Sequence, residues 1–232
     1  VIADLVERVS RRSFRGFFRD NISRPLGLTT LDFGARGDAL ARLARNYVAG
    51  FRINAPSDMY LKRAIGTTLE HAVKLSNDPR YYRAVIPAGN GVGTADECSQ
   101  FFQCLLNGGR LGGVRVFKPL TVRRAIAEVG KAELDRSLMV PLRYSAGMML
   151  GASPFGMYGP DTSKAYGHLG FANNFVWADP ERDISVGLLT TGKLLLGLHA
   201  PYLVELLCNV SKYCPKLAEG EQDELLHAAG MY

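Results

Sequence analysis

Apolar residues at the start of the chain recur with the spacing of an α-helix. The positions i, i+3, i+4 and i+7 are filled by Ile2, Leu5, Val6 and Val9, which together form one helical face. A second short helix is expected over residues 14–22, with Ser13 as its N-terminal cap. Residues 25–27 read Pro-Leu-Gly and end it, because proline cannot extend the hydrogen-bond ladder and glycine permits a left-handed exit.

A sharper helical pattern lies near the middle of the chain. Thr94 and Glu97 form the T-x-x-E sequence of a capping box. The apolar face that follows consists of Cys98, Phe101, Phe102 and Leu105, and Asn107-Gly108-Gly109 ends this helix. The pattern before it is weaker: residues 39–49 and 59–75 favour helix, and residues 77–79 favour a turn.

The hydrophobic period shortens after residue 142. Residues 144–150, 175–178 and 184–190 are predicted as strands, and the Asp-Pro-Glu-Arg-Asp turn at 179–183 joins the last two into an antiparallel hairpin. A closing helix is expected over residues 203–213. A helical region followed by an antiparallel sheet is typical of the α+β class rather than of βαβ units. We expect one domain over residues 1–232, mainly helical in 1–140, with sheet strands and a C-terminal helix in 141–232.

Composition supports a globular domain and argues against two other classes of protein. The chain has 232 residues, 47% of them hydrophobic, so it can bury a substantial core. No apolar run reaches the roughly 18 residues of a membrane-spanning helix, so no membrane span is expected. The formal net charge is +6, but the chain lacks zinc-finger spacing and aromatic–basic interleaving, so no nucleic acid partner is expected.

The excess positive charge lies near the start of the chain. Residues 1–65 hold 12 Lys or Arg against 6 Asp or Glu. One row of arginines follows the first two predicted helices: Arg8, Arg11, Arg12, Arg15 and Arg19. The row is either a basic docking stripe or a solvated helix face, and the solvated face is the more common structure.

The four cysteines do not suggest a metal site. Cys98, Cys104, Cys208 and Cys214 form no C-x-x-C pair and lie in apolar, helical patterns. Buried free thiols are the interpretation that these patterns favour. We expect neither a metal nor a cofactor.

Two glycine-rich stretches raise the question of nucleotide binding. Residues 187–193 match G-x-x-x-x-G-K, but Leu194 stands where a phosphate loop needs a hydroxyl, and Gly187 lies inside a predicted strand. The loop with Gly89, Gly91 and Gly93 precedes a helix, yet no acidic ribose partner accompanies it. Neither stretch is interpreted as a nucleotide site.

Acyl transfer fits the same region better. His168, Leu169 and Gly170 precede an apolar strand. Acyl transfer requires backbone N–H groups aimed at a developing oxyanion, and a glycine lets the substrate approach that backbone. A histidine beside it can orient the substrate or relay a proton, although a lone histidine is often only a structural residue.

Four stretches in order resemble the serine β-lactamase-like hydrolases, which include class C β-lactamases, penicillin-binding peptidases and esterases. "GHLGFANNFVWADPERDISVGLLTTG" is similar to the third motif and hairpin of that family. "RYSAGMMLG" is similar to the strand before it, "PAGNGVGTADECSQFFQCLLNGG" to the glycine loop and capped helix, and "VIADLVERVSRRSFRGFFRDNISRPLGL" to the helices after the Tyr motif. The resemblance covers nearly the whole chain, least securely at residues 36–84.

The resemblance implies a helical subdomain packed on an antiparallel sheet, the β-lactamase/transpeptidase-like fold. It also implies a nucleophilic serine in S-x-x-K, activated by that lysine and a tyrosine. His168, Leu169 and Gly170 match the third motif, and Phe171 would donate the second oxyanion-hole N–H. Among the substrate-binding residues we count Leu169 and Gly170, with Gly89 and Asn90 from the glycine loop.

The chain departs from the family in lacking S-x-x-K and the Tyr motif. Thr190 and Lys193 give T-x-x-K, but at the end of the hairpin strand. In the family both motifs precede the first helix of this chain, so we expect the chain to be the C-terminal two-thirds of the fold. An upstream segment or a second chain would carry the nucleophile. The expected function is a serine hydrolase acting on small esters or amides, with a carboxylesterase favoured; the alternative is an inactive binding or regulatory module.

Overall fold

A six-stranded antiparallel sheet forms the centre of the molecule, in the strand order β13-β12-β11-β8-β7-β6. The computed structural model describes residues 1–232 except 51–61, 64–65, 137, 172, 194–199 and 232. The strands of the central sheet are β6 (Glu133–Asp135), β7 (Val140–Tyr144), β8 (Met149–Leu150), β11 (Tyr166–Gly170), β12 (Asn174–Asp179) and β13 (Ile184–Leu188).

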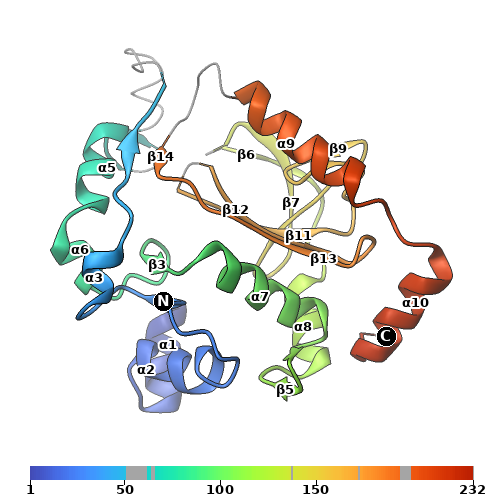
Figure 1. The fold of residues 1–232 in the computed structure, drawn as a ribbon, viewed down its shortest axis with the longest axis horizontal. Helices are drawn as coiled ribbons and strands as arrows, with labels where there is room; N and C mark the ends of the chain where they lie inside the picture. Colours follow the sequence, from blue (N-terminus) through green and yellow to red (C-terminus); the bar gives the residue numbers. More distant parts are fainter. Residues whose placement is uncertain (51–61, 64–65, 137, 172, 194–199, 232) are drawn as a thin grey trace.

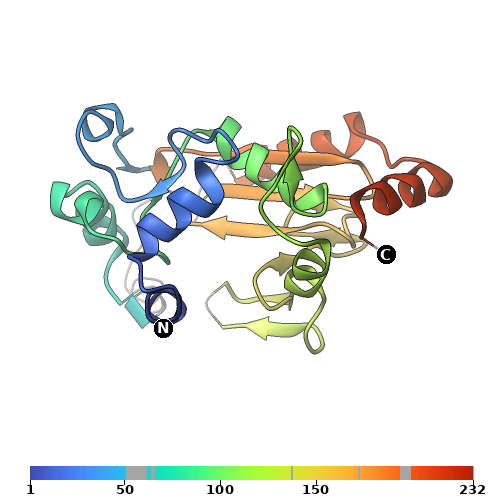
Figure 2. The ribbon, with the colours of Figure 1, turned by 90° about the horizontal axis from the view of Figure 1, so that it is seen from below.

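Helices surround this sheet, and α7 and α9 cover opposite faces of it (Figure 1). The helices are α1 (Ile2–Ser10), α2 (Phe14–Phe18), the π-helix η1 (Arg19–Ser23), α3 (Ala39–Arg42), α5 (Leu69–Ser76), α6 (Pro79–Arg83), α7 (Ala95–Leu106), α8 (Pro119–Ile126), α9 (Ala200–Tyr213) and α10 (Glu219–Ala229). Helices α1 and α2 lie at one side of the molecule and α10 at the other (Figure 2).

Four two-stranded pairs lie outside the central sheet. Three are antiparallel: β1 (Asp32–Phe33) with β3 (Gly91–Val92), β4 (Arg110–Leu111) with β5 (Val114–Arg115), and β9 (Phe155–Gly156) with β10 (Gly159–Pro160). The fourth is parallel and joins β2 (Tyr47–Val48) to β14 (Gly192–Lys193). This last pair ties the helical region to the segment that follows β13.

Strand β12 divides the core into two layers because successive side chains point to opposite faces. Phe175 and Trp177 pack with Tyr158 and with Leu207 of α9. Ala178, on the other face, belongs to the cluster that α7 builds with Phe102 and its neighbours. Each face of the sheet is therefore covered by a helix, as the α+β prediction requires.

The main sequence predictions are confirmed. Helices cover 2–10 and 14–18, the π-helix continues the second one, and α7 and α9 occupy the predicted positions. The hairpin of β12 and β13 turns at the predicted residues, and β13 ends at Leu188 rather than at residue 190. The sheet is antiparallel, as expected.

The strand predicted over residues 144–150 is wrong in one respect. It is a hairpin of two strands, β7 and β8, because the chain reverses between Tyr144 and Met149. Ser145 stabilises the reversal: its Oγ accepts from the N–H of Met148 at 2.9 Å and of Gly147 at 3.3 Å. The apolar composition of the stretch concealed this turn.

Other differences concern the helical region and the ends of the sheet. The helix predicted over 39–49 stops at Arg42, and Tyr47 and Val48 pair with β14 instead. Of the helix predicted over 59–75, α5 begins only at Leu69, and residues 59–61 and 64–65 lie outside the described residues. The sheet already begins at Glu133 with β6. Helices α8 and α10 were not predicted.

The capping box predicted at Thr94 is half correct. The Thr94 hydroxyl accepts from the Glu97 N–H at 3.1 Å, as a cap should. The Glu97 carboxylate does not accept from the Thr94 N–H, as a capping box requires. It accepts instead from the N–H groups of Thr29, Thr30 and Leu31 at 2.7, 2.8 and 2.6 Å. Both threonine hydroxyls also donate to it. Glu97 thus anchors α7 to a segment far away in the sequence.

Replacing Glu97 with glutamine is expected to lower the free energy of unfolding by roughly 2–3 kcal/mol, since hydrogen bonds to a buried charge are lost. Burial raises the Glu97 pKa, but the hydrogen bonds from Thr30 and Thr29 outweigh it and lower the pKa below 4.5. The carboxylate therefore stabilises the fold fully above pH 4.5, and this contribution is lost as the pH falls through the lowered value.

Urea unfolding of both proteins at pH 7 and at progressively lower pH measures this difference. The matched control is the exposed neighbour Asp96, whose replacement with asparagine is expected to change stability by less than about 0.5 kcal/mol. A difference for Glu97→Gln that stays the same size at low pH would contradict the assignment.

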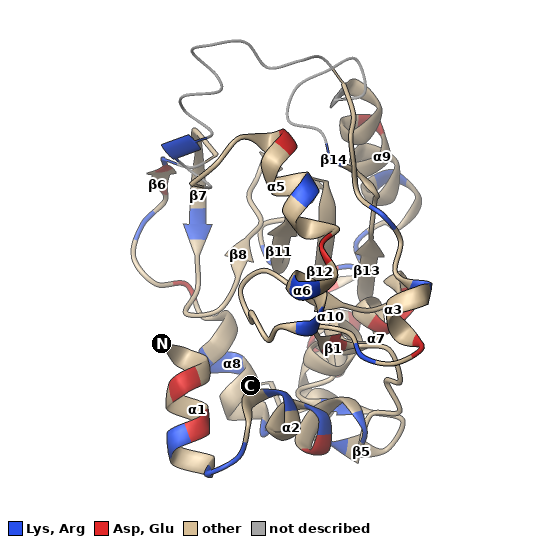
Figure 3. Ribbon diagram, turned by 90° about the vertical axis from the view of Figure 1, so that its left-hand side faces the viewer, with Lys and Arg blue, Asp and Glu red and all other residues tan. Residues whose placement is uncertain are grey.

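Several arginines of the row near the start of the chain form ion pairs with acidic side chains. Asp4 pairs with Arg8, Asp20 pairs with Arg12, Arg19 and Arg24, and Asp32 pairs with Arg15. Helix α1 carries acidic residues beside its arginine (Figure 3). This arrangement supports the solvated helix face over the basic docking stripe.

The described residues also bear on the other sequence expectations. All four cysteines are free, and burial raises the pKa of Cys98 and of Cys104 to about 11. Within the described ranges, no group of three or more His, Cys, Asp or Glu residues is placed to hold a metal ion. No helix of the described part of the chain has the length and apolar character needed to cross a membrane.

Candidate active site

The edge of β11 that faces β8 is open over most of its length. β11 pairs with β12 from Tyr166 to Gly170, but with β8 only at Tyr166 and Gly167. In the described part of the chain, no strand continues β8 beside residues 168–170. The Leu169 N–H, which points to this edge, reaches only the Met149 sulfur at 3.5 Å. An extended substrate therefore has access to the β11 backbone here.

Phe171 directly follows Gly170, the last residue of β11. Backbone N–H groups two residues apart in a strand point the same way, so we expect the Phe171 N–H to face the same edge as the Leu169 N–H. Among the described residues, none accepts a hydrogen bond from it. An unpaired N–H beside an open edge is what an oxyanion-binding site requires.

His168 lies on the exposed part of β11. Its Nδ1 is 2.7 Å from the Leu169 carbonyl oxygen. Because a carbonyl can only accept, Nδ1 carries the hydrogen, and Nε2 of the neutral ring is left as an acceptor. The ring is thus held in one tautomer, with a nitrogen able to receive a proton or to orient a hydroxyl.

The two glycines of β11 serve different purposes. A Cβ added at Gly167 would lie 2.1 Å from the Val176 carbonyl oxygen, so the packing of the strands requires glycine there. A Cβ at Gly170 would meet only Asn174, at 3.4 Å, which is an ordinary contact. Packing does not demand glycine at residue 170, which stays a predicted substrate contact.

The T-x-x-K pair and the phosphate-loop match both fail on geometry. Lys193 donates to the Thr190 carbonyl oxygen at 2.6 Å rather than to its hydroxyl. The lysine is 1% exposed, so its amine cannot meet a phosphate. Gly187 lies within β13, as predicted, and a Cβ there would be 2.2 Å from the Ala95 carbonyl oxygen.

The glycine loop requires a correction at Asn90. Its side chain is buried: Nδ2 donates to the carbonyl oxygens of Tyr81 and Ala84, each at 2.8 Å, and Oδ1 accepts from the Ile86 N–H at 2.9 Å. Because its polar atoms hold the loop itself, Asn90 is not available to a substrate. Gly89, whose carbonyl accepts from the Tyr81 hydroxyl at 2.6 Å, remains a predicted substrate contact.

The glycine loop is connected to the central sheet through α7. The loop leads through β3 into α7, whose first residue packs on Gly187 of β13. Gly187 of β13 pairs with Val176 of β12 in the hairpin that these two strands form. The structure places His168, Leu169 and Gly170 on β11, directly before Phe171, whereas Gly89 lies in the loop before β3.

Two cavities of the described structure lie away from β11. One of about 60 Å³ is lined by Leu106, Asn107, Pro180, Asp183, Leu225 and Leu226, and the other lies on α10 beside Asp223 and His227. The first is at the end of the β12–β13 hairpin opposite to Phe171, because Asp179 pairs with Ile184 there. Neither of these two cavities is lined by a residue of β11.

Sequence reasoning missed two residues at this wall. Met149 meets the Leu169 N–H through its sulfur, and the Lys193 ammonium lies 5.7 Å from the centre of the Phe171 ring. The family resemblance pointed to the strand of Met149 but not to its side chain. Lys193 carried a signal, the T-x-x-K spacing, which predicted the wrong atoms.

Known proteins resemble this chain over most of its length. The model of the family described as Beta-lactamase matches residues 1–205. The esterase/beta-lactamase LipL of Mycobacterium tuberculosis is 26% identical over 212 residues, which are 82% of this chain and 45% of that protein. The chain thus spans less than half the length of this relative.

Two solved structures share the fold. A family VIII carboxylesterase matches 92% of this chain and 55% of its own, with a TM-score of 0.73 and 23% identity. A penicillin-binding protein homologue from Caulobacter crescentus matches 90% of this chain and 55% of its own, with a TM-score of 0.68 and 24% identity. The agreement of the family model, the sheet topology and the motif on β11 leads to one conclusion: the chain belongs to the Beta-lactamase family.

Proposed function

We propose that this chain forms one wall of the acyl-enzyme site of a serine hydrolase that acts on small esters or amides, with a carboxylesterase favoured. The observation that carries the proposal is the open edge of β11, where no described residue accepts a hydrogen bond from the Phe171 N–H and the His168 Nδ1 lies 2.7 Å from the Leu169 carbonyl oxygen. The names of the relatives, an esterase/beta-lactamase and a carboxylesterase, support the same reaction class.

In the proposed reaction a serine Oγ bonds to the substrate carbonyl carbon, and the carbonyl oxygen becomes an oxyanion. The Phe171 N–H donates to that oxyanion, together with a second backbone N–H. The bond to the leaving group then breaks, and the proton removed from the serine passes to the leaving group. Water repeats the sequence to release the acid. The nucleophile, its lysine and the tyrosine come from the S-x-x-K and Tyr motifs that the family resemblance implies.

The outer edge of β13 supports a contribution from a further segment. α7 and the α9 side of the core cover both faces of β13, yet in the described residues no strand pairs with its outer edge. Strand β13 reads Ile-Ser-Val-Gly-Leu and carries neither lysine nor proline, the devices that usually protect a free edge. We infer that an upstream segment, or a second chain, adds a strand here and brings the nucleophile, and that residues 1–232 are part of one domain.

A covalent probe tests the proposal. Residues 1–232 alone are expected to remain unlabelled by a fluorophosphonate, whereas the full-length protein, with the region encoded before Val1, is expected to be labelled on one serine. Replacing the serine of its S-x-x-K with alanine is the matched control and should abolish labelling. A folded full-length protein that carries S-x-x-K and stays unlabelled would overturn the proposal.

The alternative is a binding or regulatory module on the same fold, and the same experiment separates the two. If the encoded protein has no S-x-x-K in any segment or partner chain, this alternative replaces the hydrolase. Comparing a chromogenic ester with a chromogenic β-lactam on the labelled protein then distinguishes the two substrate classes, and faster turnover of the ester is expected.

A further inference from the structure

Lys193 is a buried cation whose position packing alone does not explain. It is 1% exposed, and burial lowers its pKa to about 8. Among the described residues no carboxylate forms an ion pair with it, and its hydrogen bond goes to the Thr190 carbonyl oxygen at 2.6 Å. A methionine of similar length would fill the space without the cost of burying a charge. The ammonium group therefore has a use beyond filling the core.

The contacts of Lys193 converge on the turn between β11 and β12. Its ammonium lies over the Phe171 ring, 5.7 Å from the ring centre, a distance at which a cation is attracted to an aromatic face. Thr190, whose carbonyl oxygen accepts from Lys193, also forms hydrogen bonds to the residues at the end of this turn. The Thr190 N–H donates to the Asn174 Oδ1 at 2.8 Å, and its hydroxyl donates to the Asn173 carbonyl oxygen at 3.3 Å.

The backbone of Lys193 is anchored on the other side to the helical region. β14 pairs with β2, where the Ala49 N–H donates to the Lys193 carbonyl oxygen at 3.1 Å and the Tyr47 N–H to the Thr191 carbonyl oxygen at 2.9 Å. Phe171 follows the last residue of β11, and Asn173 has a left-handed φ of 63°. Lys193 thus connects β14, which is anchored by β2, to Phe171 in the turn between β11 and β12.

We propose that Lys193 is a positioning residue for acyl transfer, which clamps the turn between β11 and β12 and so keeps the Phe171 N–H aimed at the oxyanion. The inference rests on the proposed function, but it concerns a residue outside the S-x-x-K, Tyr and β11 motifs. It acts through Phe171 and touches no substrate. Small displacements of a catalytic group are costly, since a shift of about 1 Å can lower a rate by about 100-fold.

The test compares Lys193→Met with the wild type in the full-length protein. The turnover number for an ester substrate is expected to fall by about 10-fold, whereas KM changes by less than about 2-fold, because the turn is needed in the transition state rather than for binding. Amide hydrogen exchange at residues 171, 173 and 174 is expected to become about 10-fold faster. The matched control is Lys212→Met, which removes an exposed lysine that lies 5.2 Å from the Tyr213 ring on α9; neither readout should change.

The outcomes separate this inference from the proposed function. A wild type that turns over an ester, with a Lys193→Met variant of equal turnover number or unchanged exchange, overturns the positioning role alone. A wild type that never reacts overturns both. If Lys193→Met does not fold, Phe171→Leu removes the ring side of the clamp and keeps the N–H; an unchanged turnover number and unchanged exchange in that variant would also overturn the role.

Discussion

Proline in place of Phe171 is expected to lower the turnover number for an ester by about 100- to 1000-fold, the loss typical of one missing oxyanion-hole donor. Proline removes the backbone N–H and nothing else from the main chain. KM is expected to change far less, because the oxyanion exists only in the transition state and the intermediate. The measurement is steady-state kinetics of the full-length protein, with binding and turnover separated by a pre-steady-state burst.

The matched control for this variant is Phe171→Leu, which loses the same ring but keeps the N–H. The difference between the two variants therefore reports the loss of the N–H together with the fixed φ of proline. Both must show the wild-type melting temperature, so that unfolding does not account for the loss. If the proline variant reacts within about 2-fold of the leucine variant, a range far below the loss of a true donor, Phe171 does not serve as an oxyanion donor.

Removing Arg182 is expected to lower the free energy of unfolding by about 3–5 kcal/mol, because Asp179 would be left as an unpaired buried charge. Asp179 is 0% exposed and Arg182 is 7% exposed. The guanidinium Nη1 donates to the Asp179 Oδ2 at 2.7 Å and to the Asp161 carbonyl oxygen at 3.0 Å. Burial raises the pKa of the Asp179 carboxyl, and the bond from Arg182 opposes that rise.

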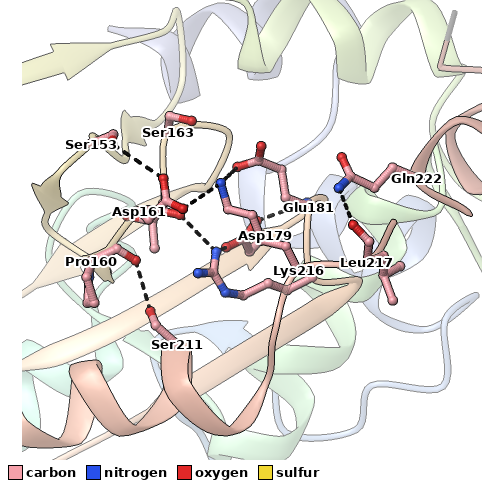
Figure 4. A network of polar contacts seen from close by, with 12 residues as sticks. Ser153, Pro160, Asp161, Ser163, Asp179, Glu181, Ser211, Lys216, Leu217 and Gln222 are labelled. Atoms are coloured by element: carbon pink, nitrogen blue, oxygen red, sulfur yellow. Dashed lines mark hydrogen bonds and ion pairs between the residues drawn. The ribbon is translucent and has the colours of Figure 1, made fainter. Parts of the chain in front are cut away.

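The pair belongs to a larger network that joins three parts of the chain (Figure 4). Lys216 bridges the Asp161 and Glu181 carboxylates at 3.0 Å each, and the Leu217 N–H donates to the Glu181 carbonyl oxygen at 2.9 Å. The network therefore fastens the segment after α9 to the turn of the β12–β13 hairpin. Loss of Arg182 is expected to loosen this attachment as well as the hairpin.

Urea unfolding of Arg182→Ala measures the effect, with Arg80→Ala as the matched control. Arg80 pairs with Asp78 at the surface, where its side chain is 88% exposed, and breaking such an exposed pair changes stability little. The double variant Asp179→Asn/Arg182→Met is expected to recover part of the loss, since no buried charge then remains unpaired. A single variant that loses no more than the surface control would show that Asp179 is not charged in the folded protein.

The sequence predicted those helices and turns whose periodicity, cap or turn residues lie within a few neighbouring positions. The helical period of α7 and its cap at Thr94, the closing helix α9, and the hairpin turn at residues 179–183 were readable in this way. The motif on β11 and the family were also readable, because the residue types and their order carry the resemblance. Helix α10 was missed because its sequence is polar and has no apolar face to detect.

Contacts between distant residues decided the remainder. Glu97 could be recognised as part of a cap, but its five donors lie on residues 66 to 68 positions away. The amide of Asn90 was expected to meet a substrate, and it serves its own loop instead. Which partner a polar side chain takes depends on what the fold brings beside it, and sequence spacing does not contain that information.

By itself, then, the sequence determined the α+β class, the family and the strand that carries the His168-Leu169-Gly170 motif. Only the tertiary structure decided that β8 stops beside Gly167 and leaves the rest of β11 open. It also decided that Lys193 is buried against Phe171 and Thr190. The physical reason is that period and turn chemistry act between neighbours along the chain, whereas strand ends, burial and side-chain partners arise from long-range packing.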